Sequence, residues 1–191
     1  MLTEQQKELL VSYKQKAFIN ALLAEQSYNY YNWIKNAVNI PLIISNTAMV
    51  CINSIITEQD LLKILNIILN SSTGLILSLI SNFHIHESIS QFETLQKKFT
   101  KLSNDIDTKI TNDLDNITIE YINNVVEDYG AINETIKYAF PNKIKKRIKS
   151  QYNGKFSLPA SLSVDIVEVC DTQPCCGKVE KKEIKNEESQ V

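Results

Sequence analysis

Polar side chains interrupt two long uncharged stretches of the sequence, and their spacing suggests a common chemistry. Asn39, Asn46 and Asn53 follow one another at intervals of seven residues, which returns a helix to within about 20° of the same direction. A second set comprises Asn66, Asn70, Thr73, Gly74 and Ser81. An unpaired amide in lipid is costly, so both stripes should face protein or water. Three interpretations stay open: hydrogen-bonded helix packing, a polar lumen between assembled copies, and drift toward Asn in an AT-rich genome.

A run of bases with no acid among them is the second group of chemically capable residues. Its members are Lys143, Lys145, Lys146, Arg147, Lys149 and Lys155. Ile144 and Ile148 add an apolar edge four residues apart, which predicts a short basic amphipathic helix. Such a helix could contact anionic lipid or a partner, and a merely solvated basic face is the alternative. Nucleic acid is a weaker candidate, because only one of the six bases is Arg.

Catalytic and metal chemistry find little support. Cys170, Cys175 and Cys176 lack the second ligand pair that zinc uses, so free thiols, a disulfide, lipidation and a soft metal stay open. His84 and His86 would point in different directions if they lay two residues apart on one helix. Phosphate-loop, nucleophile-elbow, zinc-protease and paired-carboxylate signatures are missing from the sequence. We therefore expect no enzymatic activity, no metal and no cofactor.

Two segments that could cross a membrane carry the polar stripes. Residues 36–57 and 64–86 provide 22 and 23 consecutive residues without a charge, and a helix crossing roughly 30 Å of hydrocarbon needs about 20. Aromatic residues precede the first segment, where an interfacial belt is expected: Tyr28, Tyr30, Tyr31 and Trp33. Phe83 and Phe92 are expected at the same level. The sequence thus predicts a two-span hairpin over 36–87, with two buried helices of a soluble bundle as the alternative.

Helices outside the membrane should hold this hairpin in place. Apolar residues recur at spacings of three and four over 10–31 and again over 92–136. We therefore expect an amphipathic helix over 1–35 and a helical stalk over 88–140 with a break near 103–105. Packed together, they would form a coiled-coil-like stalk suited to oligomerisation.

The remaining segments complete an all-α fold: a transmembrane helical hairpin with long cytoplasmic amphipathic helices. Lysines flank the outer ends of the hairpin, whereas its connector holds two acids and one base, so both termini are expected in the cytoplasm. Pro41 is expected in the first turn of the first span, where it costs little. A basic segment should begin at Pro141 and extend to residue 160, and residues 161–191 are expected to form a flexible tail.

The layout and two short stretches together resemble a known family. Asn39-Ile40-Pro41-Leu42-Ile43-Ile44-Ser45 opens the first span, between an N-terminal helix and a second span. This is similar to the SLATT group of two-transmembrane proteins, which includes prokaryotic effectors proposed to perforate membranes. The stretch from Phe140-Pro141 to Leu158-Pro159 resembles relatives in large nucleocytoplasmic DNA viruses. Over roughly residues 8–160, the resemblance implies a multi-pass protein of a host or virion internal membrane, with a capsid or other assembly protein as a partner.

The function expected from these features is structural. We expect an integral membrane protein that anchors a lipid bilayer and forms homo-oligomers, or contacts partners, through its stalk and basic segment. An oligomeric pore-forming effector is the first alternative, and a soluble helical-bundle adaptor is the second. Only four Gly and four Pro occur in 191 residues, which argues against a many-turned β-sandwich and a glycine-rich nucleotide fold.

Overall fold

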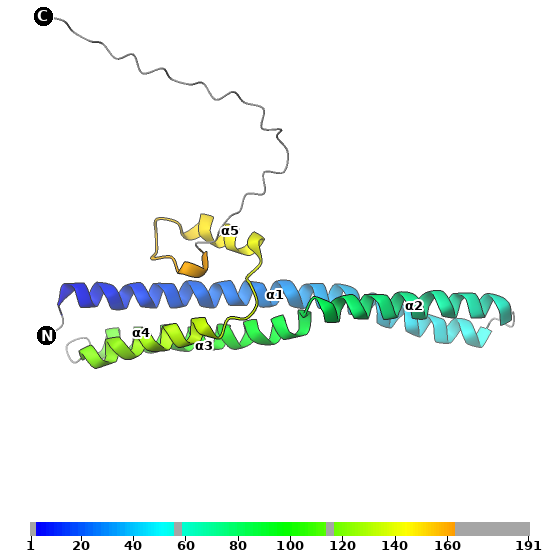
Figure 1. Cartoon of the computed structure of the whole chain (residues 1–191), viewed down its shortest axis with the longest axis horizontal. Coiled ribbons are helices and arrows are strands. Elements are labelled where there is room, and N and C mark those ends of the chain that lie inside the picture. The colour runs from blue at the N-terminus through cyan, green and yellow to red at the C-terminus, as the bar shows by residue number, and fades with distance from the viewer. Residues whose placement is uncertain (1–2, 56–58, 114–116, 163–191) are drawn as a thin grey trace, which may run out of the picture.

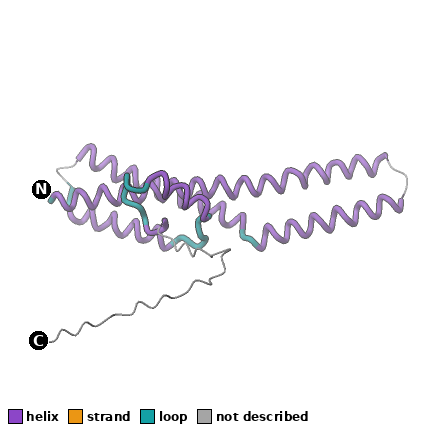
Figure 2. Tube along the Cα trace, turned by 90° about the horizontal axis from the view of Figure 1, so that it is seen from above, coloured by secondary structure: helices purple, strands orange, loops and turns teal. Residues whose placement is uncertain are grey.

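The computed structural model describes residues 3–55, 59–113 and 117–162, and these segments contain helices and no strand. The elements are α1 (Glu4–Ile55), α2 (Gln59–Asn82), α3 (Ile85–Asp113), α4 (Ile119–Glu134), α5 (Asn142–Tyr152) and the 3-10 turn η2 (Ala160–Leu162). They form two regions along one axis (Figures 1 and 2). A helical head gathers the first half of α1 with α3, α4 and α5, and a bare hairpin of the second half of α1 with α2 extends from it.

Helix α1 runs through both regions without interruption. Its 52 residues span about 78 Å at a rise of 1.5 Å per residue. Pro41 lies well inside this helix, so its expected place in a first turn is wrong. Because proline has no N–H, the carbonyl of Ala37 lacks the donor that residue 41 would otherwise supply. Membrane-spanning helices tolerate this loss, because neighbouring groups can bond the freed carbonyl. Helix α1 therefore continues without a break through residue 35, where the N-terminal helix was expected to end and the first span to begin.

The head is built on the contact between α1 and α3. Small residues of α1, Ala17, Ala21 and Ala24, are buried and permit close approach of the large side chains of α3. Those side chains are Phe92, Leu95, Phe99, Leu102 and Ile106. Helices α4 and α5 close the same apolar core with Ile122, Val125, Ile144 and Ile148. The 3/4 spacing of the apolar residues thus produces a packed core, as such spacing predicts.

The expected stalk folds back on itself. Helix α3 passes through 103–105 without a break, so the predicted break is wrong. The chain reverses beyond Asp113, and α4 runs back along the head. Thr118 caps α4, because its side-chain oxygen accepts a hydrogen bond from the N–H of Tyr121 at 3.2 Å. Helix α5 then begins directly after Pro141, close to the predicted start of the basic segment.

A buried amide joins three elements of the head. The Asn20 side chain is fully buried, and its Nδ2 donates to the Tyr129 hydroxyl at 3.1 Å. Its Oδ1 accepts from the Ser161 hydroxyl of η2 at 2.5 Å, so the ordered chain extends past the expected boundary at 160. Burial raises the pKa of Tyr129, although the Asn20 hydrogen bond acts in the opposite direction. Asn20 therefore ties α1, α4 and η2 together.

We expect Asn20→Ala to lower the free energy of unfolding of the head by roughly 1–3 kcal/mol, because it removes a fully buried amide that bonds two partly buried hydroxyls. Denaturant unfolding followed by circular dichroism in detergent measures this change. Asn124→Ala removes an exposed amide of α4 and should change stability by less than about 0.5 kcal/mol. Equal effects of the two substitutions would contradict the role given to Asn20.

Candidate membrane-embedded and interfacial sites

The hairpin leaves its apolar side chains uncovered. The large apolar residues at 46–79% exposure are Ile40, Ile43, Ile44, Val50 and Ile55 of α1, Ile64, Ile67, Ile68, Leu75, Leu77 and Leu79 of α2, and Phe83. In each of the two long helical stretches, Glu4–Ile55 and Leu62–Asn112, only 6% of the most apolar 18-residue segment is buried. The structure therefore has two helices that are long and apolar enough to cross a membrane.

A narrow seam joins the two helices of the hairpin. The less exposed residues of α1 that form it are Val38, Leu42, Ser45, Met49 and Ile52. On α2 they are Leu62, Leu65, Leu69, Thr73, Ile76 and Ile80. The spacings of three and four are those of two helices packed side by side. Thr73 of the predicted polar stripes lies on this seam, and Asn39 and Asn66, which are also of intermediate exposure, lie at its edge.

The other stripe residues each follow a seam residue directly. Asn46 follows Ser45, Asn53 follows Ile52, and the remaining members obey the same rule. They are Asn39, Asn66, Asn70, Gly74 and Ser81. A step of one residue turns about 100° around a helix. Because two antiparallel helices wind in opposite senses when seen from one end, this step leads to the same side of the hairpin in both. We call this side the amide face.

The amide face is open in a single copy of the chain. Asn46, Asn53 and Asn70 are exposed, while Asn39 and Asn66 are partly covered. No side-chain hydrogen bond joins Asn46, Asn53 or Asn70 to the residues that the structure describes. The amides therefore do not bind the two helices of one hairpin to each other, and they remain available for another surface.

The predicted aromatic belt divides into exposed and packed residues. Trp33 is 69% exposed and Tyr30 is 40% exposed. Tyr31 instead stacks on Phe92, with ring centroids 5.6 Å apart, and burial raises its pKa. Tyr28 packs against the core of the head. Phe92 therefore lies at the level of Tyr31, but it is fully buried, because it faces α1 as part of the apolar stripe of α3.

The two histidines lie at the joint between hairpin and head. Helix α2 ends at Asn82, and His84 has a left-handed φ of 49° in the turn that leads to α3. The expectation that both histidines share one helix is therefore wrong. The His84 ring stacks against Tyr138, with centroids 6.0 Å apart. Within the described residues, no group of three His, Cys, Asp or Glu side chains could hold a metal.

The cysteines contribute little to either site. Cys51 is exposed on the hairpin part of α1. The cluster of Cys170, Cys175 and Cys176 lies outside the described residues, as does most of the expected tail. The interpretations offered for these thiols therefore stay predictions.

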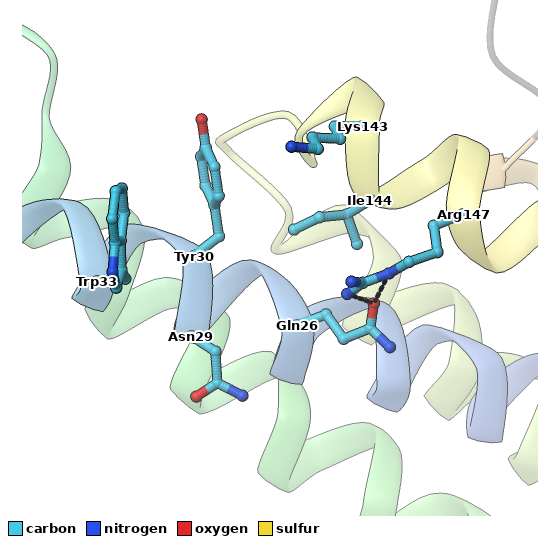
Figure 3. Close-up of a pocket in the computed structure, with 7 residues that line it drawn as sticks. All are labelled: Gln26, Asn29, Tyr30, Trp33, Lys143, Ile144 and Arg147. Carbon is cyan, nitrogen blue, oxygen red and sulfur yellow. Dashed lines mark hydrogen bonds between the residues drawn. The ribbon is translucent and has the colours of Figure 1, made fainter.

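The basic segment forms one wall of a cleft against α1. Ile144 and Ile148 bury the apolar edge of α5 in the head, so its bases are left on the outer surface. Arg147 donates from Nε to the Gln26 Oε1 at 3.2 Å and from Nη2 to the same oxygen. A cleft of about 400 Å³ results, lined by Gln26, Asn29, Tyr30, Trp33, Lys143, Ile144 and Arg147 (Figure 3). We call it the Trp33–Arg147 cleft.

Charge and position set this cleft apart from the rest of the basic segment. Two cations and no carboxylate line it, whereas Lys145, Lys146, Lys149 and Lys155 lie elsewhere. Figure 3 shows Tyr30 and Trp33 standing along α1, while from α5 Lys143 points toward Tyr30 and Arg147 reaches to Gln26. Sequence reasoning identified the aromatic and basic residues separately, but no sequence signal placed them together.

No family model, curated protein or solved structure matches this chain.

Proposed function

We propose that the chain is an integral membrane protein that anchors its helical head to a bilayer and self-associates within it. The change in burial along α1 carries this proposal. The first half of the helix buries nine-tenths or more of side chains such as Leu10, Ala17 and Leu23, whereas the second half buries only Met49 to that extent. Uncovered apolar surface of this extent is unfavourable in water and favourable in hydrocarbon.

The charge distribution supports one orientation of this anchor. Lysines lie on the head, while the connector between the two spans carries few charges. The positive-inside rule then places the head and both termini in the cytoplasm. The resemblance to the SLATT group, which implies a host or virion membrane and an assembly partner, is compatible with this orientation and remains a prediction.

A soluble adaptor would need a further layer of protein around the hairpin. Carbonate extraction of membranes from expressing cells separates this alternative from the proposal. We expect the chain to stay in the pellet, because about 20 apolar residues per span hold it in lipid. Recovery in the supernatant would contradict the membrane assignment.

Matched arginine pairs sharpen the extraction experiment. Ile44→Arg with Ile68→Arg places two charges on exposed hairpin positions, each costing about 2.5 kcal/mol or more at mid-membrane. This pair should shift the chain to the supernatant. Leu9→Arg with Ile119→Arg places the same charges on exposed positions of the head and should leave it in the pellet.

Self-association is supported by a second heptad seam on α1. Asn39, Ile43, Asn46, Val50 and Asn53 follow one another at spacings of four and three. All but the partly covered Asn39 are exposed, so this seam is complete and unoccupied in one copy. An amide both donates and accepts, so the same amide of a second copy can satisfy it across a two-fold axis. Interhelical hydrogen bonds of this kind stabilise association in membranes.

The two hairpin helices supply amides at a similar depth. Asn46 lies nine residues before the end of α1, and Asn70 lies eleven residues after the start of α2. At 1.5 Å per residue, the two positions differ by only about 3 Å in distance from the hairpin tip. A second copy docked on the amide face would therefore meet both amides together.

We expect Asn46→Leu with Asn70→Leu to weaken self-association about tenfold, because each lost hydrogen bond is worth roughly 0.6 kcal/mol or somewhat more. Energy transfer between labelled copies in lipid vesicles, measured as a function of protein density, gives the dissociation constant. Ser71→Leu with Ser72→Leu changes exposed positions that lie about 100° and 160° around α2 from Asn70, and this variant is the control. Equal dissociation constants for the two variants would argue against the amide face as the interface.

The runner-up function is an oligomeric pore, which the exposure of the amide face also favours. If several amide faces enclosed water, reconstituted vesicles should leak ions, and Asn46→Leu should abolish the leak by closing the polar wall. Leakage measured over a range of protein densities tests this directly. No leakage at any density would remove the pore and leave the anchor.

A further inference from the structure

We propose that the Trp33–Arg147 cleft binds the phosphate-bearing headgroup of an anionic phospholipid. The inference deepens the proposed function and rests on the hairpin lying in a bilayer. Trp33 is three residues before the uncharged segment that begins at Asn36, and Gln26 is ten residues before it. At 1.5 Å per residue, the cleft therefore covers a depth of about 5 to 15 Å outside the hydrocarbon. That range starts in the headgroup layer and reaches the adjoining water.

The donors in the cleft suit a phosphate oxygen. The Gln26 Oε1 holds Arg147 by two of its N–H groups, so the guanidinium is fixed in direction while its remaining donors are free for a ligand. Lys143 adds a second positive charge on a more flexible side chain. Because no carboxylate lines the cleft, an entering anion meets no like charge there. Two bases that flank one space are the usual recognition of phosphate.

The apolar side of the cleft favours a lipid over a free anion. Trp33 and Tyr30 stand between the two bases and the start of the bare hairpin, and such amphipathic rings settle at the level of headgroups. Ile144 supplies an apolar wall. A phospholipid can place its phosphate on Lys143 and Arg147 while its acyl chains lie along the exposed residues beyond Trp33. Inorganic phosphate would contact only the two bases and not the apolar residues beyond Trp33.

Trp33 is the only tryptophan of the chain, so its fluorescence reports on the cleft directly. The full chain in uncharged detergent is titrated with dioctanoyl phosphatidylglycerol, dioctanoyl phosphatidylcholine or inorganic phosphate. We expect a saturable change in Trp33 emission with the phosphatidylglycerol alone. Lys143→Ala with Arg147→Ala should weaken that binding roughly 25-fold, at about fivefold per base near a membrane surface. Lys146→Ala with Lys155→Ala removes the same charge outside the cleft and should change it less than about threefold at physiological salt.

The outcomes separate the cleft from its alternatives. Equal weakening by the two double variants would overturn the proposal in favour of diffuse electrostatic attraction. Saturation by inorganic phosphate at the same concentration would overturn the assignment to a lipid. No change with any ligand would overturn the cleft as a binding site, provided circular dichroism shows the chain folded. Because the titration is done in detergent, its result is independent of carbonate extraction, so failure of the lipid site and failure of the membrane anchor are distinguishable.

Discussion

The uninterrupted course of α1 is the constraint on which the rest of the structure depends. A helix transmits rotation as well as length, so the direction of every side chain on the hairpin is fixed relative to the head. Tyr30 and Asn46 are sixteen residues apart, which leaves them roughly 160° apart around the axis. The Trp33–Arg147 cleft and the amide face thus lie on nearly opposite sides of α1. A second copy on the amide face would leave the cleft open to lipid.

Packing within the head holds α3 and α5 in fixed positions on α1. Helix α3 covers α1 along its small residues, Ala17, Ala21 and Ala24, and so takes up the apolar face of the first half of the rod. Helix α5 is then held over α1 by the buried side chains of Ile144 and Ile148, and this apolar packing orients its bases. The buried Asn20 fixes η2 to the same surface. The cleft brings together residues 121 positions apart, Gln26 and Arg147, and this apolar packing keeps the two helices that carry them in register.

Charge and periodicity predicted the helical content and the bare hairpin, because both are local properties of the sequence. The reversal before α4 could not be predicted from the sequence, because Ile110, Leu114 and Ile117 keep the apolar spacing of four and three residues across it. The break expected at 103–105 rested on polar residues that α3 accommodates: Ser103 is buried and Asn104 faces water. The Trp33–Arg147 cleft could not be predicted, because periodicity shows which side of a helix is apolar but not which distant helix covers it.

The pattern on the amide face favours association over a lumen. A water-filled channel needs a polar wall along its whole length, because each apolar ring is a barrier to ions. On α1 the exposed amides Asn46 and Asn53 alternate with aliphatic side chains, Ile43 and Val50, and on α2 Leu77 separates Gly74 from Ser81. An alternation of branched aliphatic residues and single amides is typical of packed helix seams, in which the amide fixes the register. In such a seam the aliphatic residues pack copy against copy, and the amides select which copies can pair.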